Sequence, residues 1–319
     1  MLHKKPKKDK QPILVALTFI IFVSAFAFML IFAANAGPVI KHNNGIAEPL
    51  PNVTRLTSAD FTTVDIDNSR IYTGPLVLVN NNHECRYDGE NLVPLLERGN
   101  TAFHVTDYEV AVSSLAVEEL ERMLTDFNAK TGIDNIMVNS SYRNIELQQE
   151  LYYAEDRTSD SNYEELVAIP GYSEHQTGYA VDFSIYNKED GSFSKFDVQN
   201  EYSWILNNCA DYGFILRYPQ DKTNLTMIGY ETWHYRYVGA PHSLYIMQNN
   251  LCLEEYIDLL KSHTQSKPLY ITDSSLVNWM VYYQQADSGN ETAIAVPKNN
   301  SYQVYGNNID GFIVSVKLN

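Results

Sequence analysis

The hydrophobic and polar positions of this 319-residue chain predict an apolar N-terminal segment, a polar stretch and then a long region of strands and helices. Residues 13–34 form an uncharged apolar run, and about 20 such residues suffice for a helix to cross a bilayer. The lysines of residues 1–12 would keep that flank in the cytoplasm. We therefore expect a single-pass membrane anchor with a basic cytoplasmic tail and the remainder of the chain outside the membrane. Secretion after signal cleavage is the alternative, because residues 34–36 (Ala-Asn-Ala) resemble a cleavage site.

The region after the anchor begins with an expected linker. Residues 35–72 are rich in Asn, Thr and Pro and show little periodicity, which is typical of an extended, poorly ordered spacer. In residues 73–263, helix and strand patterns follow one another. Apolar positions from Val117 to Phe127 step by three and four, as one face of a helix requires, before Gly132 ends the helix. Strands are expected at 136–138, 180–185, 214–219 and 231–238, and further helices at 146–157, 200–212, 241–250 and 253–262.

The pattern changes after His263. Residues 264–319 predict a small C-terminal α/β module of unknown role, joined through a polar segment that ends at Pro268. Its expected elements are a strand at 269–273, a helix at 274–286 and β-type runs at 292–297, 302–305 and 312–318.

The composition limits the partners of the chain. It has 23 Lys and Arg against 39 Asp and Glu, and once the five N-terminal lysines and Asp9 are set aside, 18 basic and 38 acidic residues remain. A formal charge of −20 on this part repels nucleic acid, but a few local cations can still bind a peptide. The cysteines Cys85, Cys209 and Cys252 show no Cys-x-x-Cys spacing, so they predict neither a thiol metal site nor a disulfide framework.

Candidate chemistry centres on a histidine and an aspartate, His175 and Asp182, which stand seven residues apart. Gly178 lies between them, where we expect the backbone to pass close to another part of the chain. A second histidine, His234, follows the glutamate Glu231 by three positions. Two imidazoles, one carboxylate and an open fourth position make a catalytic zinc site, whereas structural zinc prefers four closed ligands rich in cysteine.

The spacing of Glu231 and His234 makes a demand on the fold. Residues three apart on a regular strand face opposite sides, so a turn or bulge at Thr232-Trp233 must bring both side chains to one site. A zinc ion on the three ligands would then lower the pKa of a bound water, and Glu231 would take the proton of that water. Arg143, which follows a buried strand, would stabilise the oxyanion or clamp a terminal carboxylate.

Three groups of residues follow one another along the chain with fixed internal spacings. The first surrounds Arg143, the second His175 and the third His234. They are Ser141-Tyr142-Arg143 with Gln148 and Leu151-Tyr152, then Ser173-x-His175-x-x-Gly178-x-Ala180-x-Asp182, then Glu231-x-Trp233-His234.

This arrangement resembles the VanY-type D-alanyl-D-alanine carboxypeptidases, members of a zinc metallopeptidase group that also includes the D-Ala-D-Ala dipeptidases and the hedgehog signalling domain. The resemblance covers about residues 76–260 and leaves the C-terminal module outside. We expect an α+β fold of this type, with a mainly antiparallel sheet and flanking helices. By the resemblance, the zinc ligands are His175, Asp182 and His234, the catalytic base is Glu231, and the residues that contact substrate are Arg143, Gln148 and Ser173.

The expected function is that of a monomeric, zinc-dependent D-alanyl-D-alanine carboxypeptidase that hydrolyses the terminal D-Ala from peptidoglycan stem peptides. An L,D-carboxypeptidase or a D,D-dipeptidase with the same site is the nearest alternative. A non-catalytic, hedgehog-like zinc or cell-wall-binding protein is an alternative of another class, and Glu231 argues against it, because such a protein need not retain the base. Family members often carry Pro where Thr232 stands and Thr-Gly-Tyr in place of residues 226–228, differences that concern substrate preference.

Serine D,D-carboxypeptidases perform the same reaction and have sequence motifs of their own. A Ser-x-x-Lys match begins at Ser192 and a Lys-Thr-Gly match at Lys130. Their order is reversed relative to the serine enzymes, and the second match ends a helix rather than forming a strand. Both are interpreted as chance matches.

Overall fold

The computed structural model of the protein describes residues 55–154 and 167–318. The expected tail, the anchor at 13–34 and the first part of the linker lie outside the described residues. Within the two described ranges, no helix is both long and apolar enough to cross a membrane. All described residues belong to one unit, which spans Gly45–Asn319.

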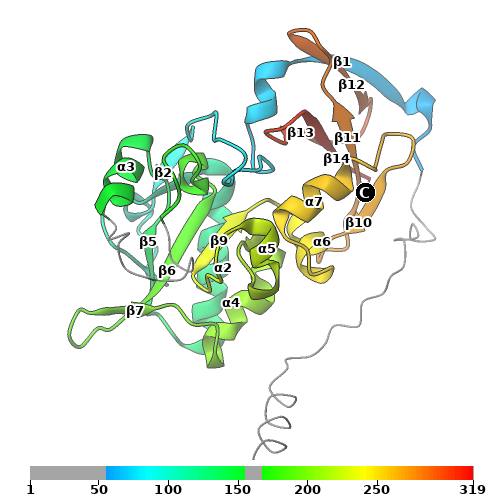
Figure 1. The fold of residues 1–319 in the computed structure, drawn as a ribbon. Coiled ribbons are helices and arrows are strands. Elements are labelled where there is room, and N and C mark those ends of the chain that lie inside the picture. The colour runs from blue at the N-terminus through cyan, green and yellow to red at the C-terminus, as the bar shows by residue number, and fades with distance from the viewer. Residues whose placement is uncertain (1–54, 155–166, 319) are drawn as a thin grey trace, which may run out of the picture. The chain divides into compact units, whose positions relative to one another are not determined.

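The central sheet has six strands in the order β3-β5-β6-β9-β8, with β7 paired to the C-terminal half of β6 (Figure 1). Every pairing is antiparallel except that of β3 with β5. The expected α+β class with antiparallel sheets is therefore confirmed. The strands are β3 His104–Val105, β5 Ile136–Ser140, β6 Ala180–Tyr186, β7 Phe193–Lys195, β8 Phe214–Leu216 and β9 His234–Tyr237.

The helix expected between Ser113 and Gly132 is confirmed as α2 (Ser114–Thr131). The Ser113 hydroxyl caps its N-terminus, and Gly132 ends it with a φ of 75°, a conformation that glycine adopts without strain. Its buried positions, from Ala116 to Phe127, join the apolar residues of β5, β6 and β9 in one hydrophobic core. This core fixes one face of the sheet against α2.

Strand β6 separates this core from the opposite face of the sheet. Val181 and Phe183 are buried in the core, whereas Asp182 between them points the other way, because side chains alternate along a strand. In the ladder, Asp182 is paired with Ser140 of β5 and with His234 of β9. The face opposite α2 therefore carries polar side chains at the centre of the sheet.

The remaining helices are short. The one expected at 146–157 is present as α3 (Ile145–Ala154), and the positions after it lie outside the described residues. Instead of one helix over 200–212, the chain forms three short segments that end at Gly213. These segments are η5 Asn200–Tyr202, α4 Ser203–Asn208 and η6 Cys209–Tyr212. The other short helices are η3 Leu96–Arg98, η7 Gln220–Lys222, α5 Thr223–Thr226, α6 His242–Gln248 and α7 Leu253–Leu260. Two short strands, β2 Leu92–Pro94 and β4 Ala111–Ser113, pair with each other.

The C-terminal residues form strands. The prediction of a helix at 274–286 is wrong, because Asn278–Gln285 is strand β11, which pairs with both β10 and β14. Met280, Val281 and Tyr282 are buried in succession, so this strand lacks the alternation of a half-exposed one. Across 264–318, where every residue is described, no helix occurs, so the expected α/β composition of the module is also wrong. Its strands are β10 Leu269–Thr272, β11 Asn278–Gln285, β12 Glu291–Pro297, β13 Tyr302–Gly306 and β14 Gly311–Lys317, with the sheet order β10-β11-β14-β13.

The described end of the expected linker is ordered structure. Phe61–Asp67 is strand β1, which pairs antiparallel with β12 along its whole length (Figure 1). Val64 and Ile66 pack against the apolar cluster that contains β12 and β14. For these residues the expectation of a poorly ordered spacer over 35–72 is wrong, because their partner strand lies at the other end of the chain. The 3-10 segments η1 Ser58–Asp60 and η2 Asn68–Tyr72 flank β1.

Candidate metal centre

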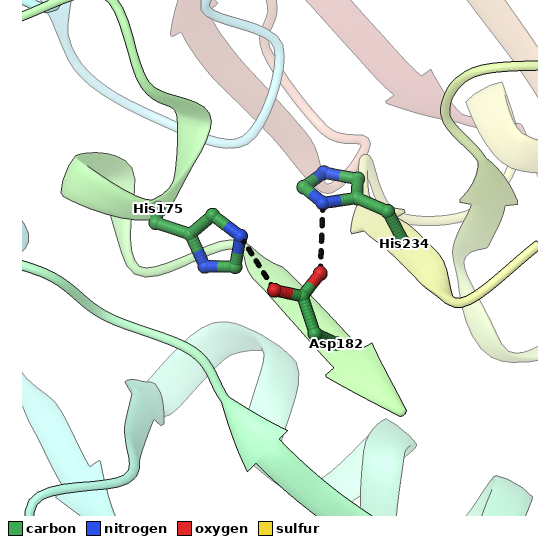
Figure 2. Close-up of side chains that lie close together, drawn as sticks. All are labelled: His175, Asp182 and His234. Carbon is green, nitrogen blue, oxygen red and sulfur yellow. Dashed lines mark hydrogen bonds and ion pairs between the residues drawn. The ribbon is translucent and has the colours of Figure 1, made fainter. Parts of the chain in front are cut away.

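Three predicted ligands, His175, Asp182 and His234, come together on the polar face of the sheet. Each offers one ligand atom, and these atoms all lie within 4.8 Å of one another. His175 belongs to the 3-10 segment η4 (Glu174–Thr177), Asp182 to β6, and His234 is the first residue of β9. Figure 2 shows the carboxylate of Asp182 between the two imidazole rings.

The position of His175 depends on the turn that follows it. Segment η4 ends at Gly178, whose φ is 73°, a value that disfavours any side chain. A Cβ at this position would lie 2.7 Å from the Leu92 Cδ2 atom, so the close approach of the backbone expected from the sequence is confirmed. The turn returns the chain directly into β6, which places His175 beside Asp182.

Hydrogen bonds orient both rings toward the carboxylate. The Nδ1 atom of His175 lies 2.5 Å from the carbonyl oxygen of Ser141, to which it donates, so its Nε2 atom faces Asp182 Oδ2 at 3.1 Å. The ring of His234 is turned the other way, with Nδ1 lying 2.9 Å from Asp182 Oδ1. The two rings meet nearly edge to face, with centroids 5.0 Å apart.

The electrostatics of the cluster favour a cation. Burial would raise the pKa of the Asp182 carboxyl, but His175 and His234 hold it well below its usual value. Burial, with the nearby charge of Arg143, lowers the pKa of His175 to about 4. Burial acts in the same direction on His234, yet the hydrogen bond to Asp182 and the neighbouring carboxylate of Glu174 outweigh it and raise the pKa of His234 to about 9. The cluster thus combines the neutral imidazole of His175 with the ionised carboxylate of Asp182, and His234 holds a proton where a metal cation would replace it.

This donor set fits a catalytic zinc ion. Among the described residues, the buried Nε2 atom of His175 has no partner in hydrogen-bonding geometry, so its lone pair is available to a metal. Ligands about 2.0–2.1 Å from a tetrahedral zinc ion lie roughly 3.3 Å from one another. The contacts of Asp182 with His175 and with His234, 3.1 and 2.9 Å, are close to that spacing. Two histidines with one carboxylate leave a fourth position for water or substrate, as catalytic zinc sites do.

Glu231 stands beside the cluster because of a turn. The expected strand at 231–238 begins only at His234, and Thr232 and Trp233 form the turn that the sequence required. The backbone N–H of His234 donates to the Glu231 carbonyl oxygen, and the Glu231 Oε2 atom lies 3.8 Å from His234 Nδ1. Burial and the charge of Asp182 raise the pKa of Glu231 to about 7, against the opposing effects of His234 and Arg143.

The predicted substrate-contact residues surround the same cavity of about 700 Å³. Arg143 Nη1 donates to Gln148 Oε1 at 3.0 Å, and its Nη2 atom lies 3.8 Å from Asp182 Oδ2. Gln148 is held in turn by a bond from Nε2 to the carbonyl oxygen of Ala168. Ser173 is buried and its hydroxyl caps η4 at the backbone N–H of His175, while its side chain also lines the cavity. Further lining residues are Leu151, Phe193, Lys195, Phe196, Tyr218, Ile228 and Trp233.

A group of buried charges behind the ligands was not predicted from the sequence. Glu174 lies between the two motif residues Ser173 and His175, and its side chain contacts Arg217 and Arg236. All three charged side chains are at most 2% exposed. A charged residue within an apolar strand run, such as Arg217 after Phe214-Ile215-Leu216, is the signal that could have revealed them.

Comparison with known proteins gives a consistent set of relatives. The profile of a protein family described as VanY, D-alanyl-D-alanine carboxypeptidase, matches residues 109–240. A D-alanyl-D-alanine carboxypeptidase of Enterococcus faecium is 34% identical over 265 residues, which cover 82% of this chain and 80% of that protein. The bifunctional D-Ala-D-Ala dipeptidase and D-Ala-D-Ala carboxypeptidase VanXYC of Enterococcus gallinarum is 33% identical over 193 residues, 58% of this chain and 94% of the relative. The crystal structure of the vancomycin-resistance D,D-dipeptidase VanXYg with a D-Ala-D-Ala phosphinate analog superposes with a TM-score of 0.71 at 32% identity, covering 81% of this chain and 99% of the other.

Proposed function

The chain belongs to the VanY family of D-alanyl-D-alanine carboxypeptidases, and from this premise we propose that it uses zinc to remove the terminal D-alanine of peptidoglycan stem peptides. Membership makes it a carboxypeptidase of a metallopeptidase family. The identity of the metal, the stem peptide as substrate and the role of each site residue are the proposal. The observation that carries it is the convergence of three ligand atoms within 4.8 Å beside a half-buried glutamate.

His175, Asp182 and His234 would hold the zinc ion. When bound, zinc supplies a Lewis acid that polarises the scissile carbonyl and lowers the pKa of a water molecule. The chain fixes these ligands from one turn and two adjacent strands, so their relative positions are set by the sheet itself.

Glu231 acts as the general base. Its carboxylate takes a proton from the attacking water, whose oxygen bonds to the carbonyl carbon of the terminal peptide bond. The same carboxyl then delivers the proton to the amine of the leaving D-alanine as the carbon–nitrogen bond breaks. The turn at Thr232-Trp233 keeps Glu231 on the ligand side of the sheet for this transfer.

Arg143 supplies positive charge on the substrate side of the cavity. Its guanidinium either stabilises the tetrahedral oxyanion or binds the terminal carboxylate of the peptide through two parallel hydrogen bonds. Gln148 holds the guanidinium in place through the 3.0 Å bond, and Ser173 contributes a polar group to the wall beside His175.

The test follows alanine release by mass spectrometry. The full-length chain is incubated with pentapeptide and tetrapeptide stems, with and without a chelator, and then with zinc restored. We expect one D-alanine to be released from the pentapeptide, no release after chelation, and recovery with zinc. Release from the tetrapeptide alone would favour an L,D-carboxypeptidase, release of the D-Ala-D-Ala dipeptide would favour a dipeptidase, and no release from any stem would reject the enzyme proposal.

The proposal extends to location. We propose that residues 13–34 anchor a monomeric enzyme in the membrane with its catalytic domain on the outer side, because the apolar run is flanked by lysines on its N-terminal side. Protease added to intact cells should then degrade the catalytic domain while the protein stays in the membrane fraction. Recovery of the chain in the medium would instead indicate signal cleavage.

A further inference from the structure

Glu174 is a buried carboxylate directly behind a metal ligand. Its Oε1 atom accepts a hydrogen bond from Arg217 Nε at 2.8 Å and lies 2.7 Å from Arg236 Nη1. Its Oε2 atom has no hydrogen-bond partner among the described residues and lies 3.6 Å from the Nε2 atom of His234. That nitrogen is also buried and without a hydrogen-bond partner in the same part of the chain. Two unpaired polar atoms thus face each other in the interior.

The two arginines hold this carboxylate from different parts of the chain. Arg217 donates Nη1 and Nη2 to the two oxygens of Glu254 on α7, at 2.9 and 2.7 Å. Arg236 donates Nη2 to the carbonyl oxygens of Pro75 and Val77. Burial of a carboxylate is costly because it loses its water, and well-formed ion pairs of this kind offset that cost. The arrangement leaves Glu174 with one oxygen fixed and the other aimed at His234.

The Oε2 atom of Glu174 can accept a hydrogen bond from a metal-bound histidine. An imidazole that binds a metal through one nitrogen carries a hydrogen on the other, and an acceptor behind the ring fixes both the tautomer and the rotation. His175 has such an acceptor in the Ser141 carbonyl, and its Nε2 atom faces the cluster. His234 faces the cluster with Nδ1 instead, so its acceptor must lie on the Nε2 side, where Glu174 stands.

We propose that Glu174 is a positioning residue, which orients His234 so that Nδ1 binds the metal and Nε2–H points to the carboxylate. This inference rests on the proposed zinc function and assigns a role outside the three ligands and the base. Loss of such a partner typically weakens metal binding by roughly 10- to 100-fold.

The test compares Glu174→Gln with a matched variant, Glu254→Gln. Both remove a negative charge from Arg217, but Glu254 does not contact His234 in the structure. Zinc affinity is measured on the full-length chain by competition with a chromophoric chelator, and folding of each apo form is checked by circular dichroism. We expect Glu174→Gln to bind zinc 10- to 100-fold more weakly and Glu254→Gln to keep the wild-type affinity within about 3-fold. Equal affinities for Glu174→Gln and wild type, or equal losses in the two variants, would overturn the proposal.

A second measurement needs no variant and applies if Glu174→Gln fails to fold. Nitrogen-15 NMR of the histidine-labelled, zinc-loaded wild-type chain reports which ring nitrogen carries the hydrogen. We expect His234 to show a metal-bound Nδ1 and a protonated Nε2, and His175 the reverse. Metal bound through Nε2 of His234 would reject the role of Glu174, whereas failure of the wild-type chain to bind zinc would reject the proposed function itself.

Discussion

Two histidines, His234 and His242, are almost equally buried, yet their pKa values are shifted in opposite directions. The ring of His242 is 1% exposed, with Nδ1 lying 2.7 Å from the Tyr256 hydroxyl and Nε2 lying 2.9 Å from the Ser315 hydroxyl. Burial lowers the pKa of His242 to about 3, so it is neutral. His234 is 4% exposed, but it touches carboxylates on both sides, and its Nε2 atom has no hydrogen-bond partner within the described ranges.

The difference shows that burial alone does not distinguish a structural histidine from a functional one. Both nitrogens of His242 are satisfied by neutral hydroxyl groups, which tie α6 to α7 and β14. The nitrogens of His234 face carboxylates instead: Nδ1 lies beside Asp182, where the proposed metal would bind, and Nε2 lies beside Glu174 with no hydrogen-bond partner among the described residues. Three tests separate the two sites, and they differ in the size of the expected effect.

The largest effect is expected at the metal centre, from Glu231→Gln. The amide cannot accept the proton of the attacking water, so kcat/KM for the pentapeptide should fall by about 10²- to 10⁴-fold. Zinc content, measured by atomic emission, should stay at the wild-type level, because Glu231 is not a ligand in this proposal. A loss of less than 10-fold would show that another group serves as the base.

An intermediate effect is expected at His242, which should make the free energy of unfolding fall as the pH is lowered. The folded-state pKa of about 3 lies below the ordinary value of 6.5, so neutral His242 favours the folded state above pH 6.5, and this contribution is lost as pH falls toward 3. The slope is at most about 1.4 kcal/mol per pH unit, which amounts to about 2–3 kcal/mol between pH 6 and pH 4. Urea unfolding of wild type and His242→Gln, both in chelator, should show the shallower pH dependence in the variant. Parallel curves would mean that water reaches the ring.

The smallest effect is expected from Ser315→Ala, which removes one of the two hydroxyl partners of His242. An unsatisfied buried nitrogen costs about 1–3 kcal/mol, so the free energy of unfolding should fall by that amount. The kcat/KM and the zinc affinity should match those of wild type, because Ser315 lies in β14 and not among the residues that line the cavity. A loss of activity in a folded variant would link the two histidine sites.

The sequence was most informative where function depends on local spacing. The eight residues from His175 to Asp182 contain one turn and the start of one strand, so a local motif was enough to predict that both reach the same point. The turn before His234 was also predictable, because a regular strand could not have placed Glu231 beside it.

Pairings between distant segments could not be predicted in this way. Arg217 and Glu174 are buried together although they lie 43 residues apart in the chain, and neither residue type suggests burial on its own. Strand β11 resembled a helix because it is buried on both faces, and β1 resembled a spacer because its partner β12 lies near the other end of the chain. Tertiary contact, rather than local propensity, decided these elements.

The last helix before the C-terminal strands has a practical consequence for any shortened form of the enzyme. Tyr256 and Leu260 of α7 are buried in one apolar cluster with Val281 of β11 and Ile313 of β14. A fragment cut at residue 263 would expose this side of α7 to water, and α7 also carries the glutamate that anchors Arg217 behind the ligands. We therefore expect a recombinant piece that extends through β14 to be more stable than one that ends at residue 263.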